Sequence, residues 1–359
     1  MADQASNRSR QDQGLGFLLQ YENVAWFEEG RVRILDRRVY PSKISFVECR
    51  TPGEVASAIR DMVTQSAGPY TAAGMGMALA AWQARGKTPE LQKEELEAAA
   101  LLLSAARPTT KSRMDKITGG ALAAAQKALD QGIPDVSPLL FQLAIASLER
   151  RYERMSRVGQ HLVSLFPQDA VVMTHCFGET IVGTMIRAAQ EKGIRLKLYH
   201  PETRPYFQGA RLTASVSAEM GADATVITDG MAAEVMSRRR VDLFTTAADA
   251  ITRDGYVVNK VGTLQIAIAA RYYEIPYYVT GIPDDMPVSD IVIEERDPAL
   301  VLEAGGIKNT RPGVKGYYPA FDITPPGLIA GVVTDKGILS PCHLADYRIS
   351  NEEADYYSG

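Results

Sequence analysis

The stretch FPQDAVVMTHC, residues 166–176, marks the point where the pattern of the sequence changes. Its apolar run, Ala170 to Thr174, is short and ends in polar residues, which is typical of a buried strand. Similar runs follow at Leu196 to Tyr199, Ala224 to Thr228, Leu243 to Ala247 and Tyr277 to Thr280, with helical segments between them. This alternation predicts βαβ units and a parallel sheet, so the fold class expected here is α/β.

The residues before this stretch look mainly helical behind a small β-hairpin. The hairpin is expected over Tyr21 to Val39, where aromatic and apolar residues alternate with polar ones around a turn. Thr51-Pro52-Gly53-Glu54 has the spacing of a capping box, so a helix should begin there and stop near Gly68-Pro69. Further helices are expected at Ala72 to Arg85, Pro89 to Ala106, Arg113 to Gln131 and Ser137 to Leu165.

Length and composition limit the classes of protein to consider. The chain has 359 residues, which is more than one compact core usually holds, so we expect two domains. Hydrophobic residues make up 46% of the chain and the formal charge is −4. These values are typical of a globular protein and argue against a nucleic-acid partner, although they allow a local basic pocket for one small anion.

The sequence also indicates a location. Cys49, Cys176 and Cys342 are odd in number and lack metal-ligand spacing, which favours a reducing cytoplasm over a disulfide scaffold. Met1 to Leu15 is polar and is expected to form a flexible leader rather than a signal peptide. The longest apolar candidate, Gly119 to Ala128, is too short to span a membrane, so no membrane partner is expected.

The polar residues that follow the strands are the candidate functional residues, because ligands of parallel sheets bind beyond the carboxyl ends of the strands. Cys176 lies at such an end, just before a helix whose positive terminus would favour a thiolate. The alternative for Cys176 is a small buried apolar residue. His175 should point to the opposite face, so we interpret it as a packing or supporting residue.

Asp249 closes the apolar run that begins at Leu243, where burial would raise its proton affinity and suit it to general acid catalysis. The alternative is a carboxylate that caps the turn at 252–255. Asn259 and Lys260 lie in the loop after Asp249 and open the next helix, where a lysine and free amides would hold a phosphate. This spacing is not the Walker pattern, so the signal is weak when taken alone.

The sequence has neither Gly-x-Gly-x-x-Gly nor Gly-x-Ser-x-Gly, and its four histidines lack the i, i+4 spacing of a metal site. Dinucleotide oxidoreductases, serine hydrolases and zinc enzymes are therefore disfavoured. We expect no cofactor and no metal.

Taken together, the strand-end motifs resemble a known family, the aldose-1-phosphate isomerases related to translation initiation factor 2B. The motifs appear in this order: Thr174-His175-Cys176, Glu202-Thr203-Arg204-Pro205, Gln208 to Thr213, Asp229 to Ala233, Ala247 to Ile251 and Asn259 to Thr263. Ile293-Glu294-Glu295-Arg296, Pro319 to Pro325 and Thr334 to Gly337 are similar to the C-terminal signature of the methylthioribose-1-phosphate branch. The resemblance runs from about Tyr21 to Pro341.

This resemblance implies a domain plan and an assembly. Residues 1–15 would be a flexible leader, 16–165 a helical N-terminal domain, and 166–359 a Rossmann-like catalytic domain. It also implies a homodimer in the cytoplasm, acting on a small-molecule sugar phosphate.

The resemblance further implies roles for individual residues. Cys176 and Asp249 match the catalytic pair, which the regulatory initiation-factor subunits generally lack, so an enzyme is expected. Arg107, Gln208, Asn259 and Lys260 match substrate-binding positions, although by default Arg107 and Gln208 would be read as solvated surface residues. The implied reaction converts a 5-substituted ribose 1-phosphate, such as methylthioribose 1-phosphate, to the ribulose 1-phosphate.

Two departures leave the substrate open. Ser66-Ala67-Gly68-Pro69 stands where the methylthioribose-1-phosphate enzymes carry Arg-Gly-Ala-Pro, so the phosphate would meet the backbone of Ser66, Ala67 and Gly68 without a guanidinium. The stretch after Cys176 is nearer in length to the ribose-1,5-bisphosphate branch, and Thr110 to Arg113 is unusually polar. The alternatives are an isomerase of ribose 1,5-bisphosphate or 5-deoxyribose 1-phosphate, or a non-catalytic regulatory or phosphate-sensing protein.

Overall fold

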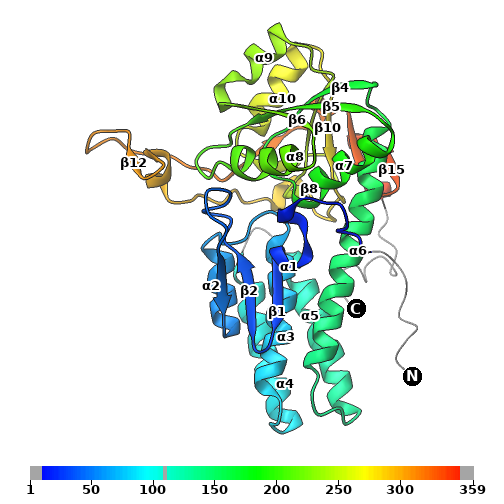
Figure 1. The fold of residues 1–359 in the computed structure, drawn as a ribbon, viewed down its shortest axis with the longest axis vertical. Coiled ribbons are helices and arrows are strands. Elements are labelled where there is room, and N and C mark those ends of the chain that lie inside the picture. The colour runs from blue at the N-terminus through cyan, green and yellow to red at the C-terminus, as the bar shows by residue number, and fades with distance from the viewer. Residues whose placement is uncertain (1–9, 108–110, 348–359) are drawn as a thin grey trace.

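The computed structural model describes residues 10–107 and 111–347, and Figure 1 shows a helical part below a sheet-containing part. The helices of the first part are α1 (Tyr21–Val24), α2 (Pro52–Arg60), α3 (Gly68–Ala84), α4 (Pro89–Ser104), α5 (Lys111–Asp130) and α6 (Ser137–Val163). Helix α6 is long enough to pack against both α3 and α7 (Glu179–Glu191), so it ties the two parts together. Among these described residues, no helix combines the length and apolarity needed to cross a membrane.

The capping box predicts the start of α2 correctly, but the end of that helix was predicted wrongly. The Thr51 hydroxyl accepts a hydrogen bond from the Glu54 N–H, and the Glu54 carboxylate accepts one from the Thr51 N–H. Helix α2 ends at Arg60, because Met62 then adopts a left-handed backbone conformation with φ of 59°. Gly68-Pro69 starts α3 instead of stopping α2, since proline fits the first turn of a helix, where its missing N–H costs nothing.

The predicted hairpin is part of a three-stranded antiparallel sheet. Its strands are β1 (Ala25–Glu28), β2 (Arg31–Leu35) and β3 (Phe46–Cys49), in the order β1-β2-β3. The prediction found the turn between β1 and β2 but missed β3. Strand β3 has only four residues, one of them the charged Glu48, so it shows little of the alternation of apolar and polar residues by which a strand is recognised.

The predicted parallel sheet is confirmed within a mixed α/β fold. It has seven strands in the order β15-β14-β10-β7-β4-β5-β6. They are β4 (Asp169–Met173), β5 (Arg195–Pro201), β6 (Asp223–Ile227), β7 (Leu243–Thr246), β10 (Tyr277–Thr280), β14 (Gly331–Thr334) and β15 (Gly337–Leu339). All neighbouring pairs are parallel except β14 and β15, which form an antiparallel edge.

Helices cover both faces of this sheet, as two adjacent residues of β4 show. Val172 packs in the apolar cluster shared with α6 and α7, whereas Met173 packs in the cluster shared with α9 and α10. Consecutive side chains of a strand point to opposite faces, so a strand buried on both sides must be apolar throughout. The remaining helices here are α8 (Ala214–Glu219), α9 (Ala232–Arg238) and α10 (Thr263–Tyr272).

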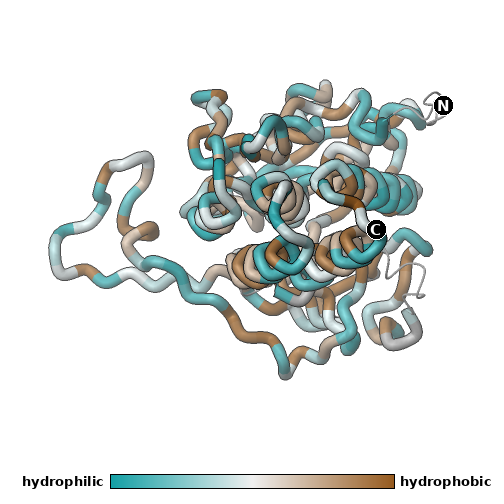
Figure 2. The backbone as a smooth tube through the Cα atoms, turned by 90° about the horizontal axis from the view of Figure 1, so that it is seen from below, coloured by the Kyte–Doolittle hydropathy of each residue, from teal (hydrophilic) through white to brown (hydrophobic). Residues whose placement is uncertain are grey.

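A second small sheet and an extended arm complete the second part. The small sheet consists of β8 (Ala250–Ile251), β9 (Val257–Lys260) and β13 (Phe321–Thr324), in the order β13-β9-β8. The arm carries β11 (Glu303–Ala304) and β12 (Ile307–Lys308) and reaches away from the rest of the molecule in both Figure 1 and Figure 2. Its base returns beside β13, where Glu295 and Pro319 form a bridge.

A buried ion pair joins the two parts. The Arg37 guanidinium, just after β2, contacts the Glu179 carboxylate in the first turn of α7, and both side chains are 0% exposed. Arg37 also donates to the Gln65 carbonyl at 2.7 Å, and the Arg151 guanidinium of α6 lies 3.6 Å from the other Glu179 oxygen. Three segments distant in sequence are therefore held to the start of α7.

The described end of the predicted leader is packed rather than flexible. Asp12 is buried and accepts a hydrogen bond from the Tyr21 backbone at 2.9 Å, and Arg187 donates to the Gln11 carbonyl at 2.9 Å. The prediction of a flexible leader over 1–15 is therefore wrong for residues 10–15, and residues 1–9 lie outside the described range. The polar composition concealed this, because the segment is held by hydrogen bonds more than by apolar burial.

Replacing Arg37 with Met should destabilise the fold by about 3 to 5 kcal/mol, because Glu179 would keep a buried charge that loses its main partner. Urea denaturation followed by circular dichroism measures this change. The matched control is Arg195→Gln, which breaks the exposed pair with Asp169 and should cost less than about 1 kcal/mol. An Arg37→Met protein as stable as the control would contradict the role of this pair.

Candidate active site

The strand order brings two candidate residues to one crevice. The strands that follow β4 in the chain are added first on one side of it and then on the other. Strands β5 and β6 lie on one side of β4, whereas β7 and β10 lie on the other side, so the strand order switches between β4 and β7. Ligands of open α/β sheets bind at such a switch point, beyond the carboxyl ends of the strands. Cys176 follows β4 and Asp249 follows β7, so both lie at the switch point and both line the same pocket.

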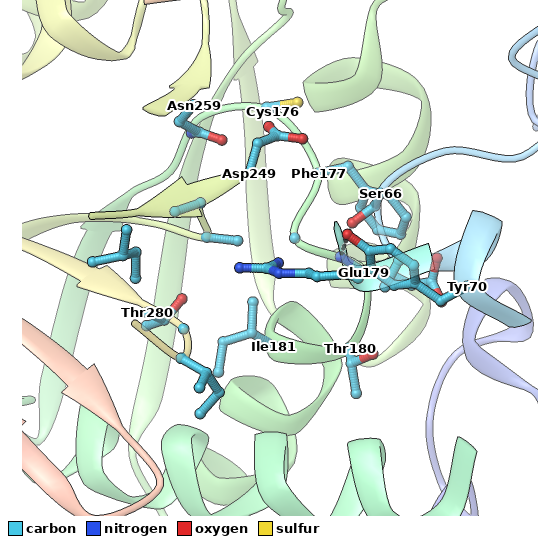
Figure 3. Close-up of a pocket in the computed structure, with 18 of the residues that line it drawn as sticks. Ser66, Tyr70, Cys176, Phe177, Glu179, Thr180, Ile181, Asp249, Asn259 and Thr280 are labelled. Atoms are coloured by element: carbon cyan, nitrogen blue, oxygen red, sulfur yellow. Dashed lines mark hydrogen bonds between the residues drawn. The ribbon is translucent and has the colours of Figure 1, made fainter. Parts of the chain in front are cut away.

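This pocket lies between the two parts and has a volume of about 350 Å³. Figure 3 shows Cys176, Asp249 and Asn259 together at one end, with Ile181, Thr180 and Thr280 further along. The pocket brings together eight predicted site residues: Ser66, Ala67, Arg107, Cys176, Gln208, Asp249, Asn259 and Lys260.

Hydrogen bonds to its backbone hold Cys176 in place. The residue has a φ of 63°, a conformation that costs energy for a residue with a side chain and that often occurs at functional sites. The Thr203 hydroxyl accepts from the Cys176 N–H at 3.1 Å, and the Thr213 hydroxyl donates to the Cys176 carbonyl at 2.5 Å. Asp229 in turn accepts from the Thr203 N–H at 2.7 Å, so two further loops fix the direction of the thiol.

The expected thiolate at Cys176 is not supported. Burial raises the pKa of the Cys176 thiol to about 11, although the nearby Lys260 opposes this shift. Desolvation thus outweighs the positive charges and the helix terminus, and the resting side chain is a neutral thiol at pH 7.

His175 matches its predicted supporting role. It is buried, and its Nε2 lies 3.0 Å from the Val261 carbonyl. The left-handed Gly262 next to it leaves room for the ring, since a Cβ there would meet Nε2 at 3.0 Å. His175 thus supports the turn that follows Lys260.

Asp249 has an ionic partner, so the expectation of wholly apolar surroundings is wrong. Its carboxylate accepts from Arg107 Nη2 at 3.2 Å, and the Asp249 side chain is 20% exposed. Arg107 also donates to the Ser66 carbonyl at 3.3 Å, so it spans the pocket from one part to the other. The alternative of a turn cap is not what the structure shows, since the 252–255 turn is closed by Thr252 bonding to Tyr256.

Asn259 and Lys260 end strand β9 rather than lying in a loop. The predicted phosphate seat on the amides of α10 is wrong, because the Asp322 carboxylate accepts from the Gly262 and Leu264 N–H groups at 2.7 and 3.1 Å. These amides are therefore occupied, and the ammonium of Lys260 is what faces the pocket.

Lys260 is a buried cation. Burial lowers the pKa of Lys260 to about 8, and the neighbouring guanidinium of Arg296 adds to this effect. The Lys260 ammonium lies 4.7 Å from the centre of the Phe321 ring, and no carboxylate of the described chain is ion-paired with it. A buried cation without a counter-charge is costly, so such a site attracts an anion.

The loop before α3 contributes two of its three predicted residues. Ser66 and Ala67 line the pocket, and the Ser66 hydroxyl accepts from the Glu179 N–H at 3.1 Å. Gly68 does not line it, which corrects the prediction. Its N–H donates to the Gln65 carbonyl, and a Cβ on Gly68 would meet the Thr64 hydroxyl at 2.0 Å.

Gln208 is buried rather than solvated, and its side-chain oxygen has no hydrogen-bond partner among the described residues. Gly209 permits this placement, because a Cβ there would meet the Pro201 carbonyl oxygen at 1.8 Å. Gln208 therefore presents an unused polar group to the pocket.

Several pocket residues escaped the sequence prediction. Arg296 was noted only as part of a C-terminal motif, and Arg113 only as part of a polar stretch. Arg113 donates to the Asp284 carboxylate at 2.7 Å, a contact between residues 171 positions apart that no sequence spacing reveals. Thr110, the first residue of that stretch, lies outside the described residues. Over the described residues no group of three His, Cys, Asp or Glu side chains is arranged to hold a metal.

Comparison with known proteins identifies the class. The Initiation factor 2 subunit family model matches residues 66–341. Methylthioribose-1-phosphate isomerase of Chloroflexus aurantiacus is 35% identical over 90% of this chain and 97% of its own. The enzyme of the same name from Pelotomaculum thermopropionicum is 34% identical over 91% of this chain and 93% of its own.

Two solved structures have the same fold. The 5-methylthioribose 1-phosphate isomerase from Pyrococcus horikoshii OT3 gives a TM-score of 0.76 at 29% identity, covering 91% of this chain and 96% of its own. The delta subunit of translation initiation factor eIF-2B from A. fulgidus gives 0.75 at 31% identity, covering 89% and 96%. Fold similarity alone therefore does not separate enzymes from initiation-factor subunits.

The chain belongs to the Initiation factor 2 subunit family. Several curated relatives are named methylthioribose-1-phosphate isomerase, a sugar-phosphate isomerase, which confirms the prediction of an enzyme of this class.

The affinity of the pocket for inorganic phosphate should fall as the pH rises through about 8, the pKa of Lys260 in the free protein. Below this pH the ammonium is charged and binds the anion; above it, binding requires uptake of a proton, so affinity drops by roughly tenfold for each further pH unit. Calorimetric titrations from pH 7 to 9.5 test this. Lys260→Arg should abolish the fall, and a wild-type affinity that stays level to pH 9.5 would contradict the prediction.

Proposed function

We propose that the protein is a methylthioribose-1-phosphate isomerase, which converts the aldose 1-phosphate to the ketose methylthioribulose 1-phosphate. The observation that carries this proposal is the meeting of Cys176 and Asp249 at the switch point, in one pocket with the cations Arg107 and Lys260. Cys176 and Asp249 would act on the sugar atoms that react, and the cations Arg107 and Lys260 would bind the phosphate. The names of the curated relatives support the same substrate.

The rest of the pocket favours an uncharged group at C5 of the sugar. Apolar side chains line it, among them Met155, Ile181, Ile251, Ile282 and Met286. The guanidinium groups there already have carboxylate partners. These pairs are Arg113 with Asp284, Arg154 with Asp335 and Arg151 with Glu179. These pairs reduce the attraction of the three guanidinium groups for a second phosphate, and the apolar lining favours a thioether over the phosphate of ribose 1,5-bisphosphate.

The first chemical step opens the sugar ring. An aldose 1-phosphate is an acetal, so its anomeric carbon cannot become a free aldehyde without acid assistance. Asp249 donates a proton to the ring oxygen as the bond from that oxygen to C1 breaks. The substrate phosphate competes for Arg107, which is the present partner of Asp249, and thereby frees the carboxyl group to face the ring oxygen.

The second step moves hydrogen from C2 to C1. A neutral Cys176 thiol is a poor base, so the structure favours transfer of the hydrogen with its electron pair over proton abstraction. The C2 hydroxyl then gives its proton back to the Asp249 carboxylate, C2 becomes the ketone, and the phosphate stays on C1. Cys176 lies beside the path and shields it from water, while Gln208 and Asn259 supply hydrogen bonds to the sugar hydroxyls.

We further propose that residues 166–359 form a Rossmann-like catalytic domain, and that residues 16–165 form the domain supplying Ser66, Ala67 and Arg107 to the opposite wall. A homodimer and a cytoplasmic location stay predictions from the family resemblance. Sedimentation analysis of the purified protein tests the dimer.

Asp249→Asn should lower kcat on methylthioribose 1-phosphate by about 10² to 10⁴-fold, the usual worth of a positioned acid. Cys176→Ser should also lower kcat, because a polar hydroxyl would attract water to the path of the hydrogen that the thiol shields. The measurement is NMR detection of the ketone carbon, on a panel that includes the ribose, 5-deoxyribose and ribose 1,5-phosphates.

Matched controls are Cys342→Ser and Asp223→Asn, which change an exposed thiol and an exposed carboxylate away from the pocket. Both should keep wild-type rates. The proposal is wrong if the wild-type protein forms no ketone from methylthioribose 1-phosphate, or if the two pocket variants retain full activity.

A further inference from the structure

The wall of the pocket beside Lys260 holds a second buried cation that the proposed mechanism does not use. Arg296 lies at the base of the arm, where its N–H donates to the Tyr318 carbonyl at 3.0 Å. Its side chain is only 9% exposed, and it lines the pocket. Nε donates to Glu294 at 2.7 Å, but Nη1 is buried without a hydrogen-bond partner among the described residues.

Arg296 and Lys260 both contact the ring of Phe321. The Lys260 ammonium lies 4.7 Å and the Arg296 guanidinium 5.5 Å from the centre of this ring. The ring attracts both cations. The charge of Arg296 lowers the pKa of Lys260, so an anion that contacts both cations would relieve this repulsion.

The carboxylates nearby are each bonded to another group. Asp249 is paired with Arg107, Glu294 is paired with Arg296, and Asp322 accepts from the amides that open α10. Lys260 therefore has no ion-pair partner of its own among the described residues, and the buried Nη1 of Arg296 has no hydrogen-bond partner there. Two neighbouring cations with unused hydrogen-bond donors are the arrangement expected of an anion-binding site.

We infer that Arg296 is a phosphate-binding residue, which together with Lys260 holds the phosphate monoester dianion of the substrate. Its guanidinium donates to two phosphate oxygens while Lys260 acts as a point charge. The arm base, which carries Arg296, then becomes part of the substrate site. This inference rests on the proposed function for the identity of the phosphate ester, but anion binding itself does not depend on turnover.

The test compares Arg296→Gln with wild type by calorimetric titration with inorganic phosphate. Losing a charge-assisted bidentate contact should weaken phosphate binding by about ten- to hundredfold. In assays with a substrate that the enzyme converts, Arg296→Gln should raise KM by a larger factor than it lowers kcat. The pH at which phosphate affinity declines should also move above that of the wild type, because Lys260 loses the repulsion of Arg296 while Arg107, Asp249, Asp322 and Cys176 stay in place.

Arg204→Gln is the matched control. Arg204 donates to the Glu303 carbonyl at 2.5 Å and so anchors the same arm, but it does not line the pocket. It should keep wild-type phosphate affinity. Equal losses in both variants would mean that Arg296 only holds the arm, and wild-type affinity in Arg296→Gln would mean that it does not bind phosphate; either result overturns the inference.

A second measurement uses the wild-type protein, so it does not depend on whether a variant folds. In wild-type crystals soaked with inorganic phosphate, the anion should lie within hydrogen-bond distance of both Arg296 and Lys260. An anion bound elsewhere, or no bound anion, contradicts the inference.

The variant Cys176→Ser separates the two proposals, since it should lose turnover and keep phosphate binding. A protein that binds phosphate through Arg296 but isomerises no sugar would refute only the proposed function.

Discussion

The buried contact between Arg37 and Glu179 is the constraint on which the rest of the site depends. Two fully buried charges are stable only when they face each other, so the loop after β2 must meet the first turn of α7. Glu179 is three residues after Cys176, and its N–H is bonded to the Ser66 hydroxyl. One interaction therefore fixes the thiol loop, the Ser66 loop and the relative position of the helical and sheet parts.

A pocket between the two parts follows from this arrangement. The sheet supplies Cys176 and Asp249 at its switch point, and the helical part supplies Ser66, Ala67 and Arg107 from the other side. Arg107 reaches across to Asp249, so an anion that binds the guanidinium competes with this carboxylate. In the proposed reaction the phosphate ester is that competitor, which links substrate binding to the placement of the acid.

Desolvation is the dominant electrostatic effect in the pocket. It raises the pKa of Cys176 and lowers that of Lys260, so both groups shift toward their neutral forms. The consequence differs for the two. A neutral thiol can shield a hydrogen transfer, whereas a lysine of lowered pKa regains its charge most readily when an anion binds. Arg296, which has no neutral form near physiological pH, keeps the wall positive.

The sequence by itself determined much of the local structure and identified eight of the residues that line the pocket. Apolar runs of four or five residues predicted β4, β5, β6, β7 and β10, and the polar residues after them included Cys176 and Asp249. Periodicity and capping report such features because they depend on neighbours in the chain. Strand β3 and the occupied amides of α10 were missed, because each depends on a contact from another segment. The end of α2 was missed because the left-handed conformation of Met62 has no signal in the residue type. Only the tertiary structure decided that β4 and β7 are adjacent, that Arg107 pairs with Asp249, and that Arg296 lies beside Lys260. Strand order and long-range pairing leave no periodic trace in the sequence, since they arise from packing between segments that are far apart in the chain.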